Sequence, residues 1–438
     1  MAARRPAATL RPQQNDLDGM LMKIAEISYF NPKAGAQIGK LPFINYIDTA
    51  AVVDGVLEGV QELQKDYPSR AQRELRNGDI LISSVRPNLK HNYFVDIAYD
   101  NMVGSTGFIQ IRPNNPDIVD AKFLYYFLTA PFNVARYVKI ADTSQSAYPS
   151  FNKDVIEEMD LPGVDITKQR KIGSLLSTID RKIALNRKRI ATLEAMAKEI
   201  YDYWFVQFDF PDAHGRPYKS SGGAMVYNPD LKREIPKGWE AKSVNDCGAF
   251  FRGVGYSKAD ERARRANTVL VMRGNNISNG RIVDDSDRVF IDKSLVSAEQ
   301  LMDGFSVLFA MSSGSKEHVG KAAVYYDYPA NAAFGAFCSK YAPQPHYRYM
   351  MFCFLASETY RAFVKRICGG TGINNMKPEY FDVPLFAVPH DEALLCKFND
   401  MAEQAYSQIC NCTQENAKLI GLRDFLLPML MNGQVNVE

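Results

Sequence analysis

Long apolar runs are missing from this sequence, and so is cysteine from its first half. The sequence contains no run of roughly eighteen apolar residues, the length needed to span a membrane. Of its residues, 46% are hydrophobic and 23% are charged. The seven cysteines all lie between Cys247 and Cys412, and an odd number confined to one half favours reduced thiols over a disulfide framework. These absences exclude a membrane protein and a disordered one, and they favour a cytoplasmic protein.

The first residues also lack the features of a secretory signal. Arg4 and Arg5 are basic, but no apolar stretch follows them before Pro12. We therefore expect residues 1–20 to form a flexible tail.

Net charge gives little information about partners. The formal charge is +2 at pH 7, and a DNA-binding protein of this size needs only a local basic face. The length of 438 residues says more, because one hydrophobic core rarely serves so long a chain. Two domains are the simplest expectation.

An internal repeat with an offset of 226 residues organises the chain. Such self-similarity carries more weight for the fold than any single motif. The residue pairs that share the offset are Ile44 and Leu270, Val56 and Ile282, Gly78 and Gly304, Phe108 and Phe334, Val138 and Val364, Asp165 and Asp391, Ile183 and Ile409, and Leu193 and Leu419. The alternative is that any two α+β domains share such patterns, but the spacing is nearly constant over about 150 residues.

Each half contains the same order of elements. Apolar and β-branched content predicts a buried strand, and apolar periodicity predicts a helix after it. Given for the first and second half, the elements are a Gly-led strand (78–84, 304–310), an amphipathic helix (121–128, 347–355) and a polar loop (144–150, 369–375). A strand marked by proline and a long helix follow both loops.

The two long helices carry the clearest signal, because their apolar residues recur at alternating spacings of four and three, the seam of a coiled coil. The first seam is Ile172, Leu176, Ile179, Ile183, Asn186, Ile190, Leu193, Ala197, Ile200 and Trp204. Adding the offset gives Phe398, Ala402, Ala405, Ile409, Cys412, Asn416, Leu419, Arg423, Leu426 and Leu430. Pairing of the two helices within the chain is favoured by their high effective concentration. The alternative is that each helix packs only on its own domain.

Antiparallel pairing of these seams places residue x opposite residue 602 − x. Asn186 then faces Asn416, and Trp204 lies near Phe398. Two facing amides can satisfy each other in a buried seam and fix its register, so we predict that role for Asn186 and Asn416. The alternative is that each amide lies at a wet edge of the seam, and Arg423 predicts a looser end.

Turn-forming residues separate the two halves. The stretch 208–223 is rich in Gly, Pro, Asp and Ser, and it leads to Ile235-Pro-Lys-Gly-Trp-Glu at the start of the second β-rich domain. We therefore expect a linker at 206–237.

These residues resemble the specificity subunits of type I restriction-modification systems. The first matching stretch is Ala195-Met-Ala-Lys-Glu-Ile-Tyr-Asp-Tyr-Trp-Phe-Val-Gln-Phe-Asp-Phe-Pro-Asp, and the second runs from Tyr218-Lys-Ser-Ser-Gly-Gly to Glu234-Ile-Pro-Lys-Gly-Trp-Glu. The resemblance covers residues 39–433. One departure is that the second domain opens with Gly238-Trp239, whereas the first has only Met22-Lys-Ile-Ala-Glu-Ile there.

The resemblance implies an α+β fold in which two α/β target-recognition domains, related by pseudo-twofold symmetry, are separated by two long antiparallel coiled-coil helices. The parts expected are the tail at 1–20, a first recognition domain at 21–165, a first spacer helix at 166–205, the linker at 206–237, a second recognition domain at 238–390 and a second spacer helix at 391–431.

The resemblance also implies a non-catalytic subunit that binds double-stranded DNA. Each recognition domain would read one half of an interrupted target, and the helices would dock two methyltransferase (modification) subunits. Restriction or translocase subunits are further candidate partners, and no membrane is expected. This chain would bind no cofactor, since S-adenosylmethionine, ATP and Mg²⁺ are expected on the partner subunits.

Catalytic motifs find little support in the sequence. A DNA methyltransferase would need a Gly-rich cofactor turn and an Asn/Asp-Pro-Pro-Tyr/Phe loop, and the chain has neither. Asp230, Glu240 and Lys242 match a loose nuclease pattern in which carboxylates bind a divalent metal, but the linker position of Asp230 favours a solvated surface residue.

Phosphate and metal sites are equally weak. The stretch 314–322 has one residue too many between its glycines for a phosphate loop, so we expect a hairpin there. Cys410 and Cys412 cannot both face one metal from a helix, and the five histidines lack zinc-site spacing. We predict no catalytic residue and no metal.

Polar loop residues are the candidates for DNA readout, because Lys and Arg bind phosphates while Arg, Asn, Gln, Ser and Thr can hydrogen-bond base edges. The predicted contacts are Ser83, Ser84, Arg86, Asn88, Lys90, His91, Ser144, Gln145 and Ser146 in the first half, and Arg273, Asn275, Asn276, Ser312, Ser313, Ser315, Lys316, Thr371, Asn374, Asn375 and Lys377 in the second. Ordinary surface exposure explains any one of them as well, so the prediction concerns the loops.

Two other functions stay open. A metal-dependent nuclease would cut DNA as the purified chain alone. A scaffold protein would hold its partners without sequence-dependent affinity for DNA.

Overall fold

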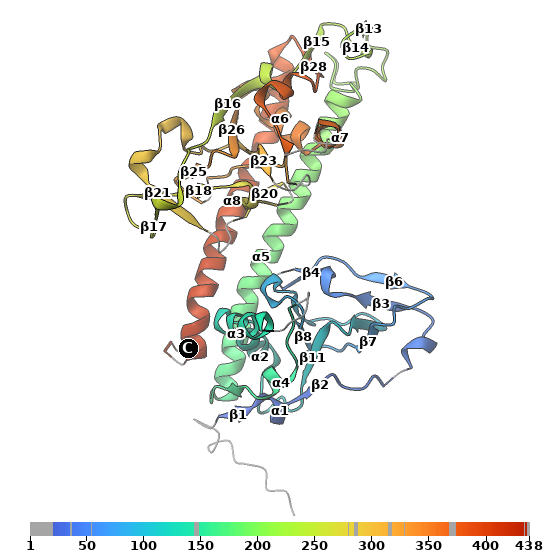
Figure 1. The fold of residues 1–438 in the computed structure, drawn as a ribbon. Helices are drawn as coiled ribbons and strands as arrows, with labels where there is room; N and C mark the ends of the chain where they lie inside the picture. The colour runs from blue at the N-terminus through green and yellow to red at the C-terminus, as the bar shows by residue number, and fades with distance from the viewer. Residues whose placement is uncertain are drawn as a thin grey trace, which may run out of the picture. The chain divides into compact units, whose positions relative to one another are not determined.

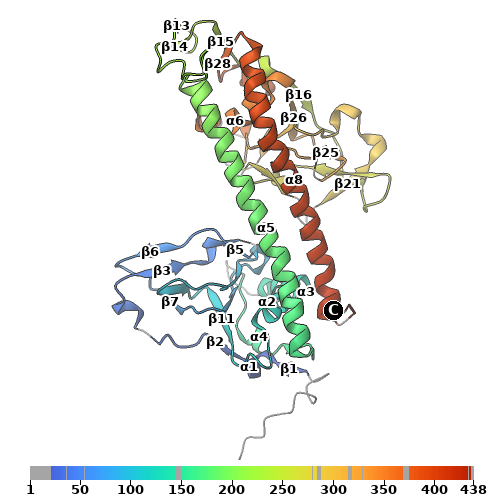
Figure 2. The same cartoon turned by 180° about the vertical axis from the view of Figure 1, so that it is seen from behind.

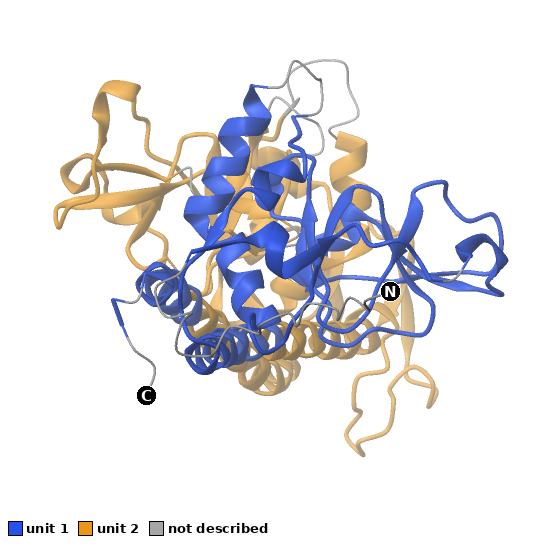
Figure 3. Cartoon of the chain, turned by 90° about the horizontal axis from the view of Figure 1, so that it is seen from below, with its two compact units in different colours: residues 1–184, 418–438 blue, residues 185–417 orange. Residues whose placement is uncertain are grey.

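The structure is a computed structural model, and it describes residues 21–35, 37–53, 55–143, 149–278, 280–283, 288–313, 318–327, 329–367, 374–432 and 434–435. The chain divides into two compact units, which are coloured separately in Figure 3. Unit 1 comprises residues 1–184 and 418–438, and unit 2 comprises residues 185–417. Each unit therefore contains one β-rich half of the chain and a part of both long helices.

Unit 1 contains two four-stranded sheets (Figure 1). The first has the order β2-β11-β8-β9, with β2 at Ser28–Phe30, β11 at Phe108–Pro113, β8 at Ile80–Ser83 and β9 at Asn92–Phe94. The second has the order β6-β3-β10-β7, with β6 at Gln61–Leu63, β3 at Ile44–Ile47, β10 at Met102–Ser105 and β7 at Ala71–Glu74. Two short ribbons pair β1 (Met22–Lys23) with β12 (Asp160–Leu161) and β4 (Val52–Val53) with β5 (Val56–Leu57).

The short helices of unit 1 are α1 (Ile24–Ile27), α2 (Ala121–Thr129), α3 (Pro131–Asp142) and α4 (Asp154–Glu157). The carboxylate of Asp120 caps α2 by accepting a hydrogen bond of 2.9 Å from the Phe123 amide, and Pro131 suits the first turn of α3 because it has no amide hydrogen to satisfy. The apolar face of α2 packs with the fully buried strand β8 in the main core of this unit. The helix predicted at 121–128 is thus observed, one residue longer.

Unit 2 repeats this arrangement. One sheet has the order β16-β26-β22-β24, with β16 at Gly248–Arg252, β26 at Cys338–Pro343, β22 at Val307–Ala310 and β24 at Ala322–Val324. The other has the order β17-β21-β18-β25, with β17 at Glu261–Arg262, β21 at Val289–Asp292, β18 at Thr268–Met272 and β25 at Ala332–Phe334. The ribbons pair β13 (Met225–Asn228) with β14 (Arg233–Pro236), β15 (Trp239–Lys242) with β28 (Phe386–Pro389), β19 (Ile277–Ser278) with β20 (Arg281–Ile282) and β23 (Ser312–Ser313) with β27 (Asn374–Asn375). Its short helices are α6 (Arg348–Ala356) and α7 (Glu358–Ile367).

The topology of unit 2 matches that of unit 1 strand for strand in the first sheet. In the second sheet, β3 and β10 are parallel neighbours in unit 1, and β18 and β25 are parallel neighbours in unit 2. The α+β class and the two β-rich halves predicted from the repeat are confirmed. The pseudo-twofold axis itself stays a prediction.

The long helices are α5 (Ile166–Tyr201) and α8 (Glu392–Met431), and they lie side by side within each unit (Figures 1 and 2). Both begin after an aspartate that shares the 226-residue offset: Asp165 accepts a hydrogen bond from the Lys168 amide, and Asp391 accepts one from the Ala393 amide. A π-helical turn at Asp202–Val206 ends the first helix. No helix in the described parts of the chain is long and apolar enough to cross a membrane.

Seam residues of the two helices are buried in both units. Ile172 and Leu176 join the main core of unit 1, while Ile190 and Ile409 join that of unit 2. The rings of Trp204 and Phe398, predicted to lie near each other, have centroids 5.8 Å apart. The packed helix pair is therefore confirmed.

The segment predicted as a linker, 206–237, is a folded part of unit 2. Phe208 and Phe210 are buried in its core, and the ring of Phe210 stacks on that of Trp239 at 5.1 Å. The Arg233 guanidinium lies 4.4 Å from the centroid of the Phe208 ring. Turn-forming residues predicted the chain reversals in this segment, but its aromatic side chains join the main core of unit 2.

Candidate nucleic-acid interface

Two of the polar segments predicted to read DNA are brought together in unit 1. The turn after β8 pairs with the chain that follows α3, because Val85 bridges to Ser150 and the Arg86 amide donates to the Pro149 carbonyl at 2.8 Å. The Phe151 amide donates in turn to the Ser84 carbonyl at 3.0 Å. Ser144, Gln145 and Ser146 lie outside the described residues, but Pro149, Ser150 and Phe151 are held beside the turn after β8.

The same juxtaposition occurs in unit 2. Ser312 and Ser313 in β23 pair antiparallel with Asn375 and Asn374 in β27. The Met376 amide extends this contact by donating to the Met311 carbonyl at 2.7 Å. Ser315, Lys316 and Thr371 lie outside the described residues, and Lys377 is an exposed neighbour of the ribbon. In both units, therefore, the segment after the Gly-led strand and a segment after a short helix, α3 in unit 1 and α7 in unit 2, form one polar edge.

The turn after β8 presents its side chains on a rigid backbone. Arg86 and Lys90 have φ angles of 48° and 52°, a left-handed conformation that is uncommon for residues other than glycine. Between them, a short 3-10 helix at Pro87–Leu89 is closed by hydrogen bonds from the Leu89 amide to the Arg86 carbonyl and from the Lys90 amide to the Pro87 carbonyl. Arg86, Asn88 and Lys90 are exposed. The turn can thus present the charged side chains of Arg86 and Lys90 and the amide of Asn88 to a ligand without refolding.

Several predicted contacts instead have their polar groups directed into the protein. Ser83 is 1% exposed and donates to the Val85 carbonyl at 2.9 Å, and Ser84 donates to the Gly107 carbonyl at 3.2 Å. Asn276 is 6% exposed and bonds the Arg273 amide and the Val283 carbonyl, while the His91 ring bonds the Val52 carbonyl. These side chains hydrogen-bond within their own loops, and their contacts with DNA stay predictions. A residue type alone does not distinguish the two roles.

The turn after β18 differs in charge from its equivalent in unit 1. Arg273 precedes a 3-10 helix at Gly274–Asn276, and Asp48 precedes the equivalent one at Thr49–Ala51. The Asp48 carboxylate accepts a hydrogen bond of 2.9 Å from the Ala51 amide. In unit 2, Asn275 within the equivalent 3-10 helix is exposed. The same place in the fold therefore carries an acid in one unit and a guanidinium in the other.

A third segment at each polar edge was missed by the sequence analysis. The turn between β10 and β11 reaches it through the Gly107 carbonyl, which accepts a hydrogen bond from the Ser84 amide at 3.2 Å. The turn between β25 and β26 does so through the Phe337 carbonyl, which accepts from the Met311 and Ser312 amides at 2.9 and 3.2 Å. The turn in unit 2, Gly335-Ala336-Phe337, has no polar side chain, and the strand register reveals where both turns lie.

The loose nuclease pattern forms no metal site among the described residues. No group of three His, Cys, Asp or Glu side chains there is placed to hold a metal ion. Of the loose nuclease pattern, Glu240 and Lys242 form an ion pair of 3.0 Å on one strand, and Asp230 is exposed in the turn after β13. The strands β22 and β24 pair antiparallel around 311–321, as the predicted hairpin requires.

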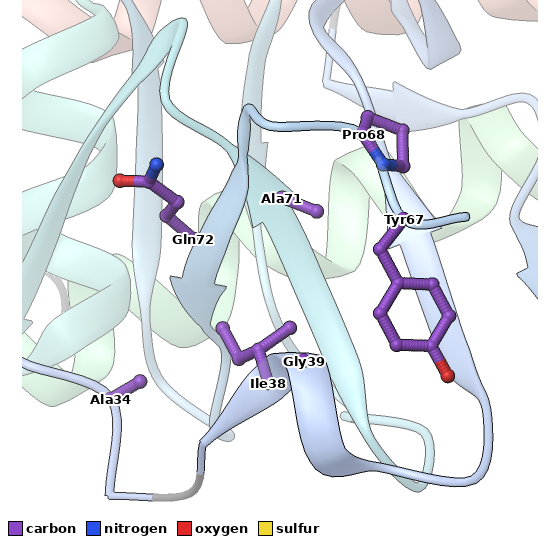
Figure 4. Close-up of a pocket in the computed structure, with 7 residues that line it drawn as sticks. All are labelled: Ala34, Ile38, Gly39, Tyr67, Pro68, Ala71 and Gln72. Atoms are coloured by element: carbon purple, nitrogen blue, oxygen red, sulfur yellow. The ribbon is translucent and has the colours of Figure 1, made fainter. Parts of the chain in front are cut away.

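An open pocket of about 380 Å³ lies in unit 1 (Figure 4). It is lined by Ala34, Ile38, Gly39, Tyr67, Pro68, Ala71 and Gln72. The Tyr67 hydroxyl donates to the Leu41 carbonyl at 2.7 Å, and the other lining side chains offer no acid, base or nucleophile. None of the predicted DNA contacts lines this pocket.

Polar residues in the helix pair are each given a partner. In unit 2, Asn186 donates through Nδ2 to Asn416 at 3.0 Å and to Glu415 at 2.7 Å. In unit 1, the Arg423 guanidinium donates to Asp180 at 2.9 Å, and the Tyr126 hydroxyl donates to the other oxygen of the same carboxylate at 2.7 Å. Arg423 therefore does not loosen the end of the seam as expected, because an acid one residue beyond its predicted partner position binds it.

Comparisons with known proteins find similarity to specificity subunits of type I restriction systems. The model of the family described as Type I restriction modification DNA specificity domain matches residues 21–195. The Type I restriction enzyme HindI specificity subunit of Haemophilus influenzae is 24% identical, over 85% of this chain and 89% of that protein. The MjaIX specificity subunit of Methanocaldococcus jannaschii is 26% identical, over 82% of this chain and 78% of that protein.

A solved structure has a similar fold. The S subunit of a type I restriction-modification system from M. genitalium superposes with a TM-score of 0.54 at 14% sequence identity. The match covers 96% of this chain and 98% of that chain.

Proposed function

Because the chain belongs to the family of type I restriction-modification specificity subunits, we propose that its two β-rich parts, 21–165 and 238–390, each read one half of a bipartite DNA target. Specificity subunits are the non-catalytic components of these systems and determine which DNA target is recognised. The long helices at 166–205 and 391–431 dock two methyltransferase subunits. S-adenosylmethionine, ATP and Mg²⁺ are bound by those partners and by any restriction subunit. The complex acts in the cytoplasm.

The observation that carries this proposal is the polar edge formed in both units. Each edge joins two segments that are far apart in the sequence, and each presents amides, hydroxyls or cations of the types that bind base edges and phosphates. Equivalent edges in two units of the same topology are what a protein needs to contact two separated stretches of one duplex.

A difference between the two units supports a target with two different halves. Asp48 in unit 1 is replaced at the equivalent place by Arg273 in unit 2. An aspartate can accept a hydrogen bond from the cytosine amino group, whereas an arginine can donate to guanine. The same framework can therefore select different bases.

Exposed apolar residues on the long helices support the docking of partners. Met196 on α5 is 53% exposed and Leu422 on α8 is 47% exposed. They are separated by the 226-residue offset, so each unit presents an apolar side chain at the equivalent helix position. Two equivalent surfaces fit two copies of one partner.

Met196→Asp or Leu422→Asp should each reduce the bound methyltransferase from two copies to one, as measured by native mass spectrometry. Retention of both copies would contradict the docking proposal.

The decisive experiment exchanges residues 39–161 for the matching segment of a relative with a different target. Mapping of methylated adenines in cells should then show one half of the motif changed and the other unchanged. A change in both halves would contradict modular reading. An unchanged motif would favour the scaffold, and metal-dependent cutting by the purified chain alone would favour the nuclease.

A further inference from the structure

Phe337 is the most exposed large apolar side chain in the described parts of the chain. Its relative exposure is 72%, and it lies in the turn between β25 and β26. An aromatic ring left in water forgoes the free energy of burial. The other exposed ring of comparable accessibility in unit 2, Tyr227, lies in the β13–β14 ribbon, and no predicted DNA contact lies in that ribbon.

The backbone beneath Phe337 is tightly held. Its carbonyl accepts the two hydrogen bonds from Met311 and Ser312 at the end of β22, and the Gly335 amide donates to the Met272 carbonyl at 2.9 Å. Ser312 is itself paired with Asn375. The backbone that carries the exposed ring is therefore held next to Ser312 in the polar edge of unit 2.

The equivalent position in unit 1 cannot carry such a ring without rearrangement. Gly107 occupies it, and a Cβ added there would lie 2.9 Å from Cγ2 of Thr49. In unit 2, the residue equivalent to Thr49 is Gly274, which has no side chain to oppose Phe337. Gly107 and Thr49 in unit 1 thus correspond to Phe337 and Gly274 in unit 2. The two units therefore differ here in shape as well as in charge.

We propose that Phe337 is a specificity-determining residue that contacts the C5-methyl group of a thymine in the half of the target read by unit 2. The proposal rests on the proposed function of the chain. A phenylalanine ring has no group that donates or accepts a conventional hydrogen bond, so it cannot read the polar pattern of a base edge. The thymine methyl is the one apolar feature that a base presents in the major groove, and the neighbouring polar side chains can read the remaining pattern.

Deoxyuridine provides the test, because it differs from deoxythymidine only by this methyl group. The chain, assembled with its methyltransferase subunits, is titrated with duplexes in which each thymine of the target is replaced in turn. One replacement in the half read by unit 2 should weaken binding about fourfold, as expected for the loss of one buried methyl group. With Phe337→Ala, the thymine and uracil duplexes should bind equally, whereas Phe337→Leu should keep part of the difference.

Tyr227→Ala is the matched control, since it also removes an exposed ring from unit 2 and should leave the discrimination unchanged. Melting of the variant complexes shows that Phe337→Ala folds. The inference is overturned if the wild-type complex tolerates every replacement, if the half-target contains no thymine, or if Phe337→Ala keeps the fourfold difference. A wild-type complex that binds all duplexes equally, whatever their sequence, overturns the proposed function itself.

Discussion

Asn186 donates a hydrogen bond of 3.0 Å to Asn416 across the two long helices, and both side chains are buried, at 2% and 8% exposure. The second hydrogen of the same amide group can serve Glu415, whose carboxylate lies 2.7 Å away. An unpaired amide at either place would lose its water without compensation. The contact therefore links the energetics of two positions that are 230 residues apart in the sequence.

We expect the two asparagines to be coupled in stability. Asn186→Leu leaves the Asn416 oxygen without this donor, and Asn416→Leu leaves Asn186 with only Glu415, so each should cost about 1–3 kcal/mol. The double variant places two apolar side chains in the seam and should cost less than either single change. Urea denaturation of the four proteins in a double-mutant cycle measures the coupling.

Asn411→Leu is the control for that cycle, because Asn411 is exposed on α8 and should change stability by less than about 0.5 kcal/mol. Strictly additive effects of Asn186→Leu and Asn416→Leu would contradict the register role that we predict for the pair.

The helix pair shows how far periodicity can be followed. Alternating spacings of four and three identified Ile172, Ile190 and Ile409 as seam residues, and all three are buried. The same spacing placed Arg423 in the seam but did not reveal its partner, Asp180, which is 243 residues away in the sequence. Repeats and periodicity reveal the backbone, whereas ion pairs depend on side-chain geometry that a spacing rule does not contain.

The polar edges were predicted only in part for a similar reason. The segments after β8 and β22 follow apolar strands and are rich in polar residues, so their positions could be inferred. Whether a serine such as Ser83 faces solvent or its own backbone depends on the turn conformation. Phe337 gave no signal at all, because an isolated aromatic residue in a sequence is more often part of a core.

Arg86 is the residue in unit 1 where direct base readout should be easiest to detect. If its guanidinium contacts a guanine in the bidentate manner, Arg86→Ala should lose roughly 1–3 kcal/mol of discrimination at one position of the half-target read by unit 1. Arg273→Ala should act in the same way on the other half. Binding titrations with all four bases at each target position measure the effect.

Arg86→Lys is the informative control, because it keeps the positive charge but not the planar fork. Loss of affinity by the same factor on every sequence would identify Arg86 as a phosphate contact, and unchanged binding would remove it from the interface.

Three buried thiols should resist alkylation at a pH where the exposed thiol of Cys396 reacts. Burial raises the pKa of Cys247, Cys338 and Cys353 to about 12. At pH 8 only about one molecule in ten thousand would then carry the reactive thiolate at each position. Cys396 is exposed. Iodoacetamide followed by peptide mass spectrometry should label Cys396 within minutes and the buried thiols only after denaturation.

The sign of the pH dependence follows from the raised pKa. Reaction at the three buried thiols should rise about tenfold for each unit of pH up to the highest pH at which the protein stays folded. A rate at Cys247 equal to that at Cys396 at pH 8 would contradict the burial of this residue.

Asp79 should be the most sensitive charged residue of unit 1. It is fully buried and accepts two hydrogen bonds of 2.7 Å from the Arg112 guanidinium, one of 2.8 Å from the Gln110 amide group and one of 2.8 Å from the Arg76 backbone amide. The carboxylate hydrogen bond is also the largest cause of the raised pKa of Arg112. Asp79 directly precedes β8, the strand that leads into the polar edge, and Gln110 and Arg112 lie on the neighbouring strand β11.

Removal of one partner of a buried ion pair typically costs about 3–5 kcal/mol, because the other charge is left without compensation. The Arg112 side chain is 20% exposed, so water can relieve part of the loss, and we expect Asp79→Ala to fall at the lower end of that range. Arg112→Met should cost more, because it leaves the inaccessible carboxylate unpaired.

Hydrogen exchange resolves the effect by unit: amides of β8 and β11 should lose protection, while those of β22 and β26 should keep it. Arg76→Ala provides the matched control, since its side chain is 58% exposed and pairs with Glu74 at the surface, where an ion pair contributes about 0–1 kcal/mol. Equal exchange rates in the wild type and Asp79→Ala would contradict a stabilising role for this pair.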